Sequence, residues 1–397
     1  MKVALVCPAS LPATQFGGIV FLAVDLAREI SEMGHEVTIY TTDLDFSNGP
    51  NKFNKELPRI EKFEKFRINR THVWFTIKLF FINISMSKQI ENDNPDIIHT
   101  IGLRSFQSII AWRVSKKLKI PLVVSDQGGL TTHPFLSESG PFLKMLYKIQ
   151  KIIIKKIINH SSAISVANEY EQKIFQSLNQ ELKIEIIRNG VNLKTLVSKQ
   201  NFREKYQINS RFVLFVGRFS KVKGIKNLIL AWNIVKDEKK FSDTKLIIMG
   251  VDFGYQKEME LLIEKLNLSE RIVVIKNPPR EYIISAYGES EFLVFPSQWE
   301  LSPLTPLESF AFKKPVISTN SHGTPYVVKN NENGILVEAE NSIELAKAII
   351  RLLDDNTLKE RLGMSGYQFV HEDGNCISMA NNTLKLYMKV LESSYNK

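Results

Sequence analysis

Two glutamates near the C-terminal end of the chain, Glu300 and Glu308, are separated by seven residues. An apolar segment, residues 291–295, precedes them, and a second one, residues 315–319, follows. This order predicts a strand, an acidic loop, a helix and a strand, so both carboxylates should lie at the C-terminal edge of an α/β sheet, where such folds bind ligands. Because one glutamate falls in the loop and the other in the first helical turn, we expect them to reach different parts of one ligand.

A purely structural role for the glutamates is the alternative. Thr305, Pro306 and Glu308 match a capping box, with Thr as the N-cap, Pro at the first helical position and Glu at the third. Glu308 would then only stabilise a helix start, and Glu300 would be a solvated loop acid. A functional role for the pair is favoured only when other residues of the chain supply suitable chemistry.

A basic pair is expected at the same sheet edge. Residues 213–217 are an apolar strand that ends at Gly217, so Arg218 should project at the C-terminal edge of that strand. Lys223 follows in a loop, and Gly224 precedes a helix. The planar fork of an arginine and the point charge of a lysine together suit a diphosphate.

Strand-like runs alternate with helical stretches along the first half of the chain, and they do so again in the second half. The expected strands of the first half are residues 2–7, 36–41, 96–99, 122–125 and 163–166. Those of the second half are residues 212–216, 245–249, 272–275, 292–295 and 316–318, with helices at 225–236, 257–266, 281–287 and 308–312. We therefore predict an α/β fold of two Rossmann-like, doubly wound parallel sheets that face each other across a cleft.

The boundary between the two domains is expected near residue 195, in a polar stretch without strand signals. Residues 1–195 would form the first domain and residues 196–376 the second. A length of 397 residues favours two domains. Residues 377–397 form a last helix without a following strand, and we expect it to pack back on the N-terminal domain.

Composition excludes several classes of protein. The two cysteines, Cys7 and Cys376, give neither a disulfide framework nor metal-ligand spacing, and they are typical of reduced thiols in a cytosolic protein. No G-x-G-x-x-G opens a helix, which argues against a dinucleotide oxidoreductase. Gly17 and Gly18, in the first strand–helix loop, are a weak phosphate signal, and a simple turn is the alternative.

The net charge of +10 is concentrated in an apolar helix without acids, residues 143–158. Its lysines are Lys144, Lys148, Lys151, Lys155 and Lys156. A basic amphipathic helix of this kind favours an anionic membrane surface, and a solvated lysine face on a domain helix is the alternative. We expect no nucleic-acid partner, because the aromatic residues do not interleave with the basic ones. No apolar run is long enough to span a bilayer.

The motifs together resemble glycosyltransferase family 4, whose members have the two-domain GT-B fold. Gly-Arg-x4-Lys-Gly at 217–224 and Glu-x7-Glu at 300–308 are the central matches. Further matches, which extend over nearly the whole chain, are Gly17-Gly18, Asp-x-x-His at 96–99, Asn-Gly-Val-Asn at 189–192, Pro-Val-Ile-Ser-Thr-Asn-Ser-His-Gly at 315–323 and a late Asn-Gly-x-Leu-Val hairpin at 333–337.

The resemblance implies transfer of a sugar from a UDP- or GDP-linked donor to a saccharide or lipid-linked acceptor. It further implies retention at the anomeric carbon, and neither a metal nor another cofactor. The N-terminal domain would bind the acceptor and the C-terminal domain the nucleotide sugar. We expect a role in bacterial surface polysaccharide biosynthesis, such as lipopolysaccharide or capsule, in the cytoplasm and peripherally at the inner face of the membrane.

The resemblance also implies a role for each site residue. Arg218 and Lys223 would neutralise the leaving diphosphate, and Glu300 would face the donor sugar, so these three are the expected catalytic residues. Attack would occur from the front face, with the donor's own phosphate helping to take the acceptor proton. The expected nucleotide-sugar-binding residues are Gly17, Gly18, Arg218, Lys223, Glu300, Leu304, Thr305 and Glu308.

Among these binding residues, Glu308 would accept hydrogen bonds from the ribose hydroxyls. The backbone amides of Leu304 and Thr305, at the start of a helix, would support sugar or phosphate oxygens.

The sequence departs from the family pattern at two places. Gln127 stands where the family often has a histidine, and glutamine can position a ligand but cannot act as a base. Asp126 or His133 would compensate on the acceptor side, or both are structural. Tyr326 stands where the family often has glutamate. Two other functions stay open: a non-catalytic nucleotide-sugar-binding subunit of a polysaccharide assembly, and a sugar-nucleotide epimerase on the same fold.

Overall fold

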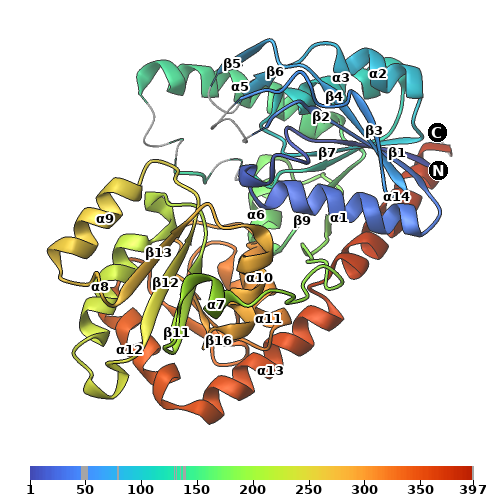
Figure 1. Ribbon diagram of the computed structural model, residues 1–397. Coiled ribbons are helices and arrows are strands. Elements are labelled where there is room, and N and C mark those ends of the chain that lie inside the picture. Colours follow the sequence, from blue (N-terminus) through green and yellow to red (C-terminus); the bar gives the residue numbers. More distant parts are fainter. Residues whose placement is uncertain are drawn as a thin grey trace. The chain divides into compact units, whose positions relative to one another are not determined.

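The computed structural model describes residues 1–45, 52–77, 80–128, 130, 132–134, 136 and 140–395 (Figure 1). The chain divides into two compact units. One contains Met1–Asn189 together with the segment from Cys376 onward, and the other contains Gly190–Asn375.

A mostly parallel sheet forms the centre of the N-terminal unit, in the order β10-β9-β8-β7-β1-β2-β4-β3. Its strands are β1 (Lys2–Val6), β2 (Glu36–Thr42), β3 (Ile60–Phe63), β4 (Phe66–Thr71), β7 (Ile97–Ile101), β8 (Leu122–Ser125), β9 (Ala163–Val166) and β10 (Ile184–Ile186). β3 pairs with β4 in antiparallel orientation, and the other neighbours are parallel. The central strands are buried along nearly their whole length and are mostly apolar, as a sheet covered on both faces requires.

Helices cover this sheet, and a separate antiparallel pair of strands, β5 (Phe75–Ile77) and β6 (Phe80–Ile82), accompanies it. The helices are η1 (Thr14–Phe16), α1 (Gly18–Glu32), α2 (Met86–Asp93), α3 (Phe106–Leu118), α5 (Pro141–His160), α6 (Glu169–Leu178) and α14 (Cys376–Tyr395). The buried side chains of α1 recur at helical spacing, as in an amphipathic helix. The helix is followed by Gly34, whose φ of +86° favours glycine.

The last helix, α14, is part of the N-terminal core and packs against α1. Tyr387, which is fully buried, shares a 2.7 Å hydrogen bond with Nδ1 of His99, and Nε2 of His99 lies 2.7 Å from the hydroxyl of Ser125. Burial lowers the pKa of His99 to about 3, so the ring is neutral. These bonds join the centre of the sheet to a helix made at the other end of the chain.

The C-terminal unit has a parallel sheet in the order β13-β12-β11-β14-β15-β16. Its strands are β11 (Phe212–Val216), β12 (Lys245–Gly250), β13 (Ile272–Lys276), β14 (Leu293–Phe295), β15 (Val316–Thr319) and β16 (Gly334–Val337). Its helices are α7 (Phe202–Tyr206), η2 (Lys221–Lys223), α8 (Ile225–Val235), η3 (Lys239–Phe241), α9 (Gln256–Lys265), α10 (Arg280–Glu289), α11 (Leu304–Ala311), η4 (Thr324–Tyr326), α12 (Ser342–Asp354) and α13 (Asn356–Glu372). The strand order runs outward from β11 on one side and from β14 on the other.

One expected element has a different pairing. Residues 333–337 do not form a hairpin strand, because β16 pairs in parallel with β15 from Val316↔Gly334 to Thr319↔Val337. The connection between these strands crosses over through η4, so β16 extends the parallel sheet by one more strand.

Candidate active site

The topological switch point of the C-terminal sheet lies between β11 and β14, which are neighbours in the sheet. Arg218 follows the C-terminal end of β11, and Glu300 lies in the loop that follows β14. Open α/β sheets bind their ligands outside the carboxyl ends of the strands at such a point. The fold therefore brings the expected basic and acidic residues to the most favourable edge of this sheet.

Gly224 allows the two loops at this edge to approach each other. Its φ is +70°, and a Cβ at this position would lie 1.9 Å from the carbonyl oxygen of Pro296. Next to it, the backbone N–H of Gln298 donates to the carbonyl of Val222 across 2.8 Å. Only glycine fits here, and the close contact holds Lys223 against the loop that carries Glu300.

Lys223 and Glu300 form an ion pair between the two loops. Both side chains are largely buried, and the ammonium group also lies 5.2 Å from the ring centroid of Phe295. The backbone of Glu300 is fixed as well, since its carbonyl accepts the N–H of Gly323 across 2.9 Å. The lysine expected to bind a diphosphate is thus oriented by the glutamate expected to face the sugar.

Arg218 is exposed and lies over the ring of Phe253, with Cζ 4.9 Å from the ring centroid. Protein nevertheless fills much of the volume around it, and this desolvation lowers the pKa of the guanidinium, while the nearby Glu300 carboxylate opposes the shift. The group stays protonated. Arg218 is therefore a partly dehydrated cation that water can still reach, which is a suitable state for binding an anion.

Glu308 is buried in α11 and is held by two side chains of α10. Arg280 donates to both carboxylate oxygens, one of them across 3.1 Å, and the hydroxyl of Tyr287 donates across 2.8 Å. Burial, and then the charge of Glu308, raise the pKa of Tyr287 well above its ordinary value, so the phenol remains a donor.

The capping box considered from the sequence is not formed. α11 begins at Leu304, with Pro303 as the N-cap and no side-chain capping bond, so Thr305 is the second helical residue. Glu308 consequently lies in the second turn of the helix rather than the first. The amides of Leu304 and Thr305 lie in the first turn, where backbone N–H groups have no intrahelical acceptor.

The remaining expected site residues belong to the N-terminal unit. Gly17 is the N-cap of α1 and has a φ of +116°, a conformation that requires glycine although the space around it is open. Gly18 is the first residue of that helix. The pair therefore makes the turn that leads from β1 into α1, at the C-terminal edge of the N-terminal sheet.

Gln127 has a φ of +53°, and its side-chain amide exchanges two 3.0 Å hydrogen bonds with the amide of Asn189. Asp126 is buried and accepts the N–H of Leu130 across 2.7 Å. His133 is half-buried in the segment that follows. Gln127 thus ties the loop after β8 to the end of the N-terminal unit.

Glu171, on α6, is buried near Asp126, and no sequence motif indicates it. Its carboxylate accepts the N–H of Ala167 across 2.6 Å. Burial, and then the charge of Asp126, raise its pKa to about 8, against the effect of the Ala167 N–H. Glu171 therefore holds a proton at neutral pH.

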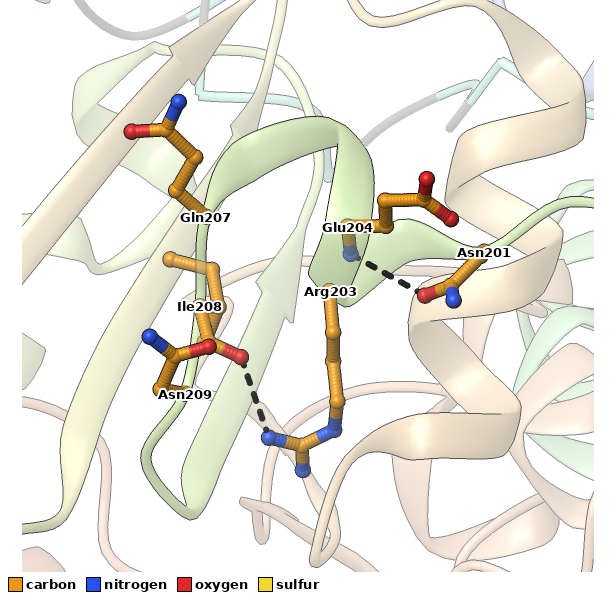
Figure 2. Close-up of a pocket in the computed structure, with 6 residues that line it drawn as sticks. All are labelled: Asn201, Arg203, Glu204, Gln207, Ile208 and Asn209. Carbon is orange, nitrogen blue, oxygen red and sulfur yellow. Dashed lines mark hydrogen bonds between the residues drawn. The ribbon is translucent and has the colours of Figure 1, made fainter.

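A surface hollow of about 620 Å³ lies around α7, and none of the expected site residues lines it (Figure 2). Its lining residues are Asn201, Arg203, Glu204, Gln207, Ile208 and Asn209. The guanidinium of Arg203 donates to the backbone carbonyls of Ile208 and Ser210, across 3.4 and 2.6 Å. Its charged group is thus used within the fold, and we assign the hollow no function.

Comparison with known proteins identifies the family. The model of glycosyltransferase family 4 matches residues 16–195, and that of glycosyl transferases group 1 matches residues 198–369. Together the two cover most of the chain. The chain belongs to glycosyltransferase family 4.

Among individual relatives of this family-4 chain is the UDP-Gal:alpha-D-GlcNAc-diphosphoundecaprenol alpha-1,3-galactosyltransferase of Escherichia coli. It is 28% identical over 292 residues, which are 69% of this chain and 70% of the relative.

Solved structures share the fold. The sucrose-phosphate synthase of Thermosynechococcus elongatus matches with a TM-score of 0.78, 20% identity and 99% of both chains. Anabaena Alr3699/HepE in complex with UDP-glucose matches with a TM-score of 0.75 and 16% identity, over 98% of this chain and 100% of the other. The family-4 chain therefore has the GT-B fold, with its two parallel α/β units, as the sequence predicted, and it is a glycosyltransferase.

The structure adds residues to the site that the sequence analysis missed. Arg280 and Tyr287 hold Glu308, and Phe253 lies under Arg218. Arg280 carried a usable signal, because it is the first helical residue after β13, at the same sheet edge. Phe253 and Tyr287 carried none, since their partners are distant in sequence. Among the helices of the described residues, none has the length and apolar character of a transmembrane span.

Proposed function

We propose that this glycosyltransferase moves a sugar from a UDP- or GDP-linked donor to a saccharide or lipid-linked acceptor, with retention of anomeric configuration. The observation that carries the proposal is the pair of cations, Arg218 and Lys223, at the switch point of the C-terminal sheet beside Glu300. A departing nucleoside diphosphate develops negative charge on its oxygens. Fixed, partly dehydrated cations stabilise such charge more in the transition state than in the ground state.

The two cations take the role that a divalent metal has in other transferases, so the proposed reaction needs no metal or other cofactor. Arg218 offers a planar fork for two phosphate oxygens, and Lys223 offers a point charge oriented by Glu300. The first-turn amides of Leu304 and Thr305 add neutral donors for oxygens of the donor.

The two glutamates are assigned to different parts of the donor. Glu308 already accepts from Arg280 and Tyr287, but a carboxylate has about four lone-pair sites, so it can also accept from the ribose hydroxyls. Glu300 lies closer to the cations and is assigned to the transferred sugar. The acceptor hydroxyl attacks from the face that the diphosphate leaves, and a phosphate oxygen of the donor takes its proton.

For the acceptor we propose a saccharide that is assembled on a lipid for a bacterial surface polysaccharide, with the enzyme at the inner face of the membrane. The name of the Escherichia coli relative specifies a diphosphoundecaprenol acceptor, which supports this class. The complex of Alr3699/HepE with UDP-glucose supports a UDP-linked donor as the first to test.

Donor screening tests this proposal. The purified protein is mixed with UDP- and GDP-sugars, with and without EDTA, and thermal shift and slow donor hydrolysis are measured. We expect one donor to raise the melting temperature and to be hydrolysed equally in EDTA, releasing the sugar with the donor's own anomeric configuration in a proton NMR time course. Binding without any turnover would instead support the non-catalytic subunit, and inversion would contradict the mechanism.

A further inference from the structure

A row of apolar side chains on α5 points to solvent. Phe142, Met145, Ile149 and Ile152 are between 51% and 66% exposed. Their spacing of three, four and three residues places them on one face of the helix. The opposite face, with Ile154, Ile157 and Ile158, is buried in the N-terminal core. Packing on the domain therefore accounts for only part of the apolar character of this helix.

A row of lysines lies beside this apolar row. Lys144, Lys148, Lys151 and Lys155 follow one another at spacings of four, three and four residues, and all are exposed. At 3.6 residues per turn, the lysine row borders the exposed apolar row on one side. No acid on α5 neutralises these charges. A helix with this pattern lies in the interface of an anionic bilayer, with apolar residues inserted and cations at the headgroups.

A second exposed apolar group lies on β5 and the residue before it. Trp74 is 74% exposed, and Phe75 and Ile77 are exposed as well. Tryptophan is the residue most typical of a membrane–water interface, because one end of the indole is apolar and the other can donate a hydrogen bond. In a folded domain such a group is otherwise expected to be covered.

Both groups flank the beginning of α3. Phe80 of β6 contacts the ring of Phe106, the first residue of α3, with 5.7 Å between the ring centroids. On the other side, Gln150 of α5 donates to the carbonyl of Arg104 across 2.9 Å, and the guanidinium of Arg104 lies 4.9 Å from the ring centroid of Tyr147. Figure 1 draws β5, β6 and α5 at one end of the N-terminal unit.

We propose that the exposed row of α5 and the aromatic group of β5 form one surface that seats the protein on an anionic bilayer. The choice of a lipid surface rests on the proposed function, which places the acceptor in a membrane. Charge complementarity supports it independently, since only an anionic partner relieves the repulsion within the lysine row. A second copy of the chain fits less well, because a symmetric contact through α5 would bring two lysine rows together.

Vesicle sedimentation of the full chain tests the surface, with phosphatidylcholine vesicles compared to vesicles that contain phosphatidylglycerol. We expect binding to the anionic vesicles only, and a loss of binding as salt rises. Replacing Lys148, Lys151 and Lys155 by Gln should weaken partitioning about a hundredfold, because each cation near an anionic leaflet contributes about fivefold. The control replaces the same number of exposed lysines elsewhere: Lys173, Lys265 and Lys347.

The apolar part has its own variants. Ile149→Gln should weaken binding about tenfold, whereas Ile343→Gln, at an isoleucine of α12 that is at least as exposed, should not. Trp74 gives a direct signal, because its emission should shift to the blue on anionic vesicles and the shift should vanish in Trp74→Phe. Equal binding to both kinds of vesicle, or wild-type binding by the lysine variant, would overturn the proposal.

Two further measurements separate the alternatives. Size-exclusion chromatography detects a dimer, and a dimer that Ile149→Gln dissociates, without vesicle binding, would assign the surface to self-association instead. Nucleotide binding by calorimetry without vesicles should be the same in all these variants. A failure of nucleotide binding in the wild type would contradict the proposed function and leave the vesicle result to be judged by itself.

Discussion

Lys223 and Glu300 are 77 residues apart in the chain and form an ion pair whose side chains keep only 12% and 13% of their surface accessible. A largely buried pair of this kind has given up much of its hydration, so each charge depends on the other for its orientation. In the proposed mechanism the lysine gains a second anion when a diphosphate binds, and Glu300 continues to orient it. Removing the lysine charge and removing the glutamate charge should therefore have different effects on binding and turnover.

Removing the basic pair should abolish transfer. Arg218→Ala or Lys223→Ala each takes one cation from the leaving diphosphate, and such a contact contributes about 3 kcal/mol to transition-state stabilisation, or about a hundredfold or more in rate. Steady-state release of nucleoside diphosphate measures the effect. Lys221→Ala is the matched control, because this exposed lysine pairs with Glu258 instead. Near wild-type turnover in either site variant would mean that the site is wrongly assigned.

The two glutamates should separate binding from turnover. Glu308→Gln is expected to weaken nucleoside diphosphate binding about tenfold, since a charge-assisted acceptor for the ribose is lost. Glu300→Gln keeps an amide oxygen that can accept from Lys223, so it should bind the nucleotide as the wild type does and lose turnover. Calorimetry with the plain nucleoside diphosphate decides between these outcomes. Unchanged affinity with a lower melting temperature in Glu308→Gln would leave this residue only the structural role of holding Arg280 and Tyr287.

The glycine that brings the loops together should not tolerate a side chain. In Gly224→Ala the new Cβ would lie 1.9 Å from the carbonyl oxygen of Pro296, so the loop carrying Lys223 must move. We expect loss of turnover together with a lower melting temperature. Gly34→Ala is the control, because its φ is also positive but nothing lies within 4 Å. This control should cost only the backbone strain of about 1–2 kcal/mol and keep full activity.

The buried carboxyl of Glu171 should give the stability of the protein a pH dependence. Its folded pKa of about 8 lies above the unfolded value, so the folded state binds more protons between about pH 4.5 and 8. Stability from this group is therefore present below that window and falls by up to about 1.4 kcal/mol per pH unit within it.

Glu171→Gln copies the protonated form, so it should change the melting temperature little at pH 5 and raise it relative to the wild type at pH 8.5. Differential scanning fluorimetry at the two values measures this. An equal difference at both pH values would show that the carboxyl does not titrate in this range.

The central strands could be predicted because burial on both faces leaves a continuous apolar run. β8, β9 and β11 coincide with the expected residues, since each is such a run between polar segments. β3 and β10 were missed for the opposite reason: they are edge strands, half-exposed and mixed in polarity. Local pattern alone cannot distinguish such strands from loops, because their pairing depends on a partner elsewhere in the chain.

At the start of α11, tertiary contacts override a local capping pattern. Thr305, Pro306 and Glu308 have the spacing of a capping box, yet Glu308 is taken by Arg280 and Tyr287. These partners lie 28 and 21 residues earlier, on another helix, and the residues next to Glu308 in sequence do not predict them. The basic pair and the two glutamates, in contrast, follow strands whose ends the sequence defines.

The position of α14 has a consequence for how the protein is made. Met379, Tyr387 and Val390 belong to the same core as the first strands of the chain, and Tyr387 bonds His99 across 288 residues of sequence. During synthesis the strands β1, β2 and β7 leave the ribosome before the helix that completes their core, and the whole second unit is made in between. The core of the first unit is therefore completed only after Gly190–Asn375 has been synthesised, and a chain cut at Asn375 would lack part of that core.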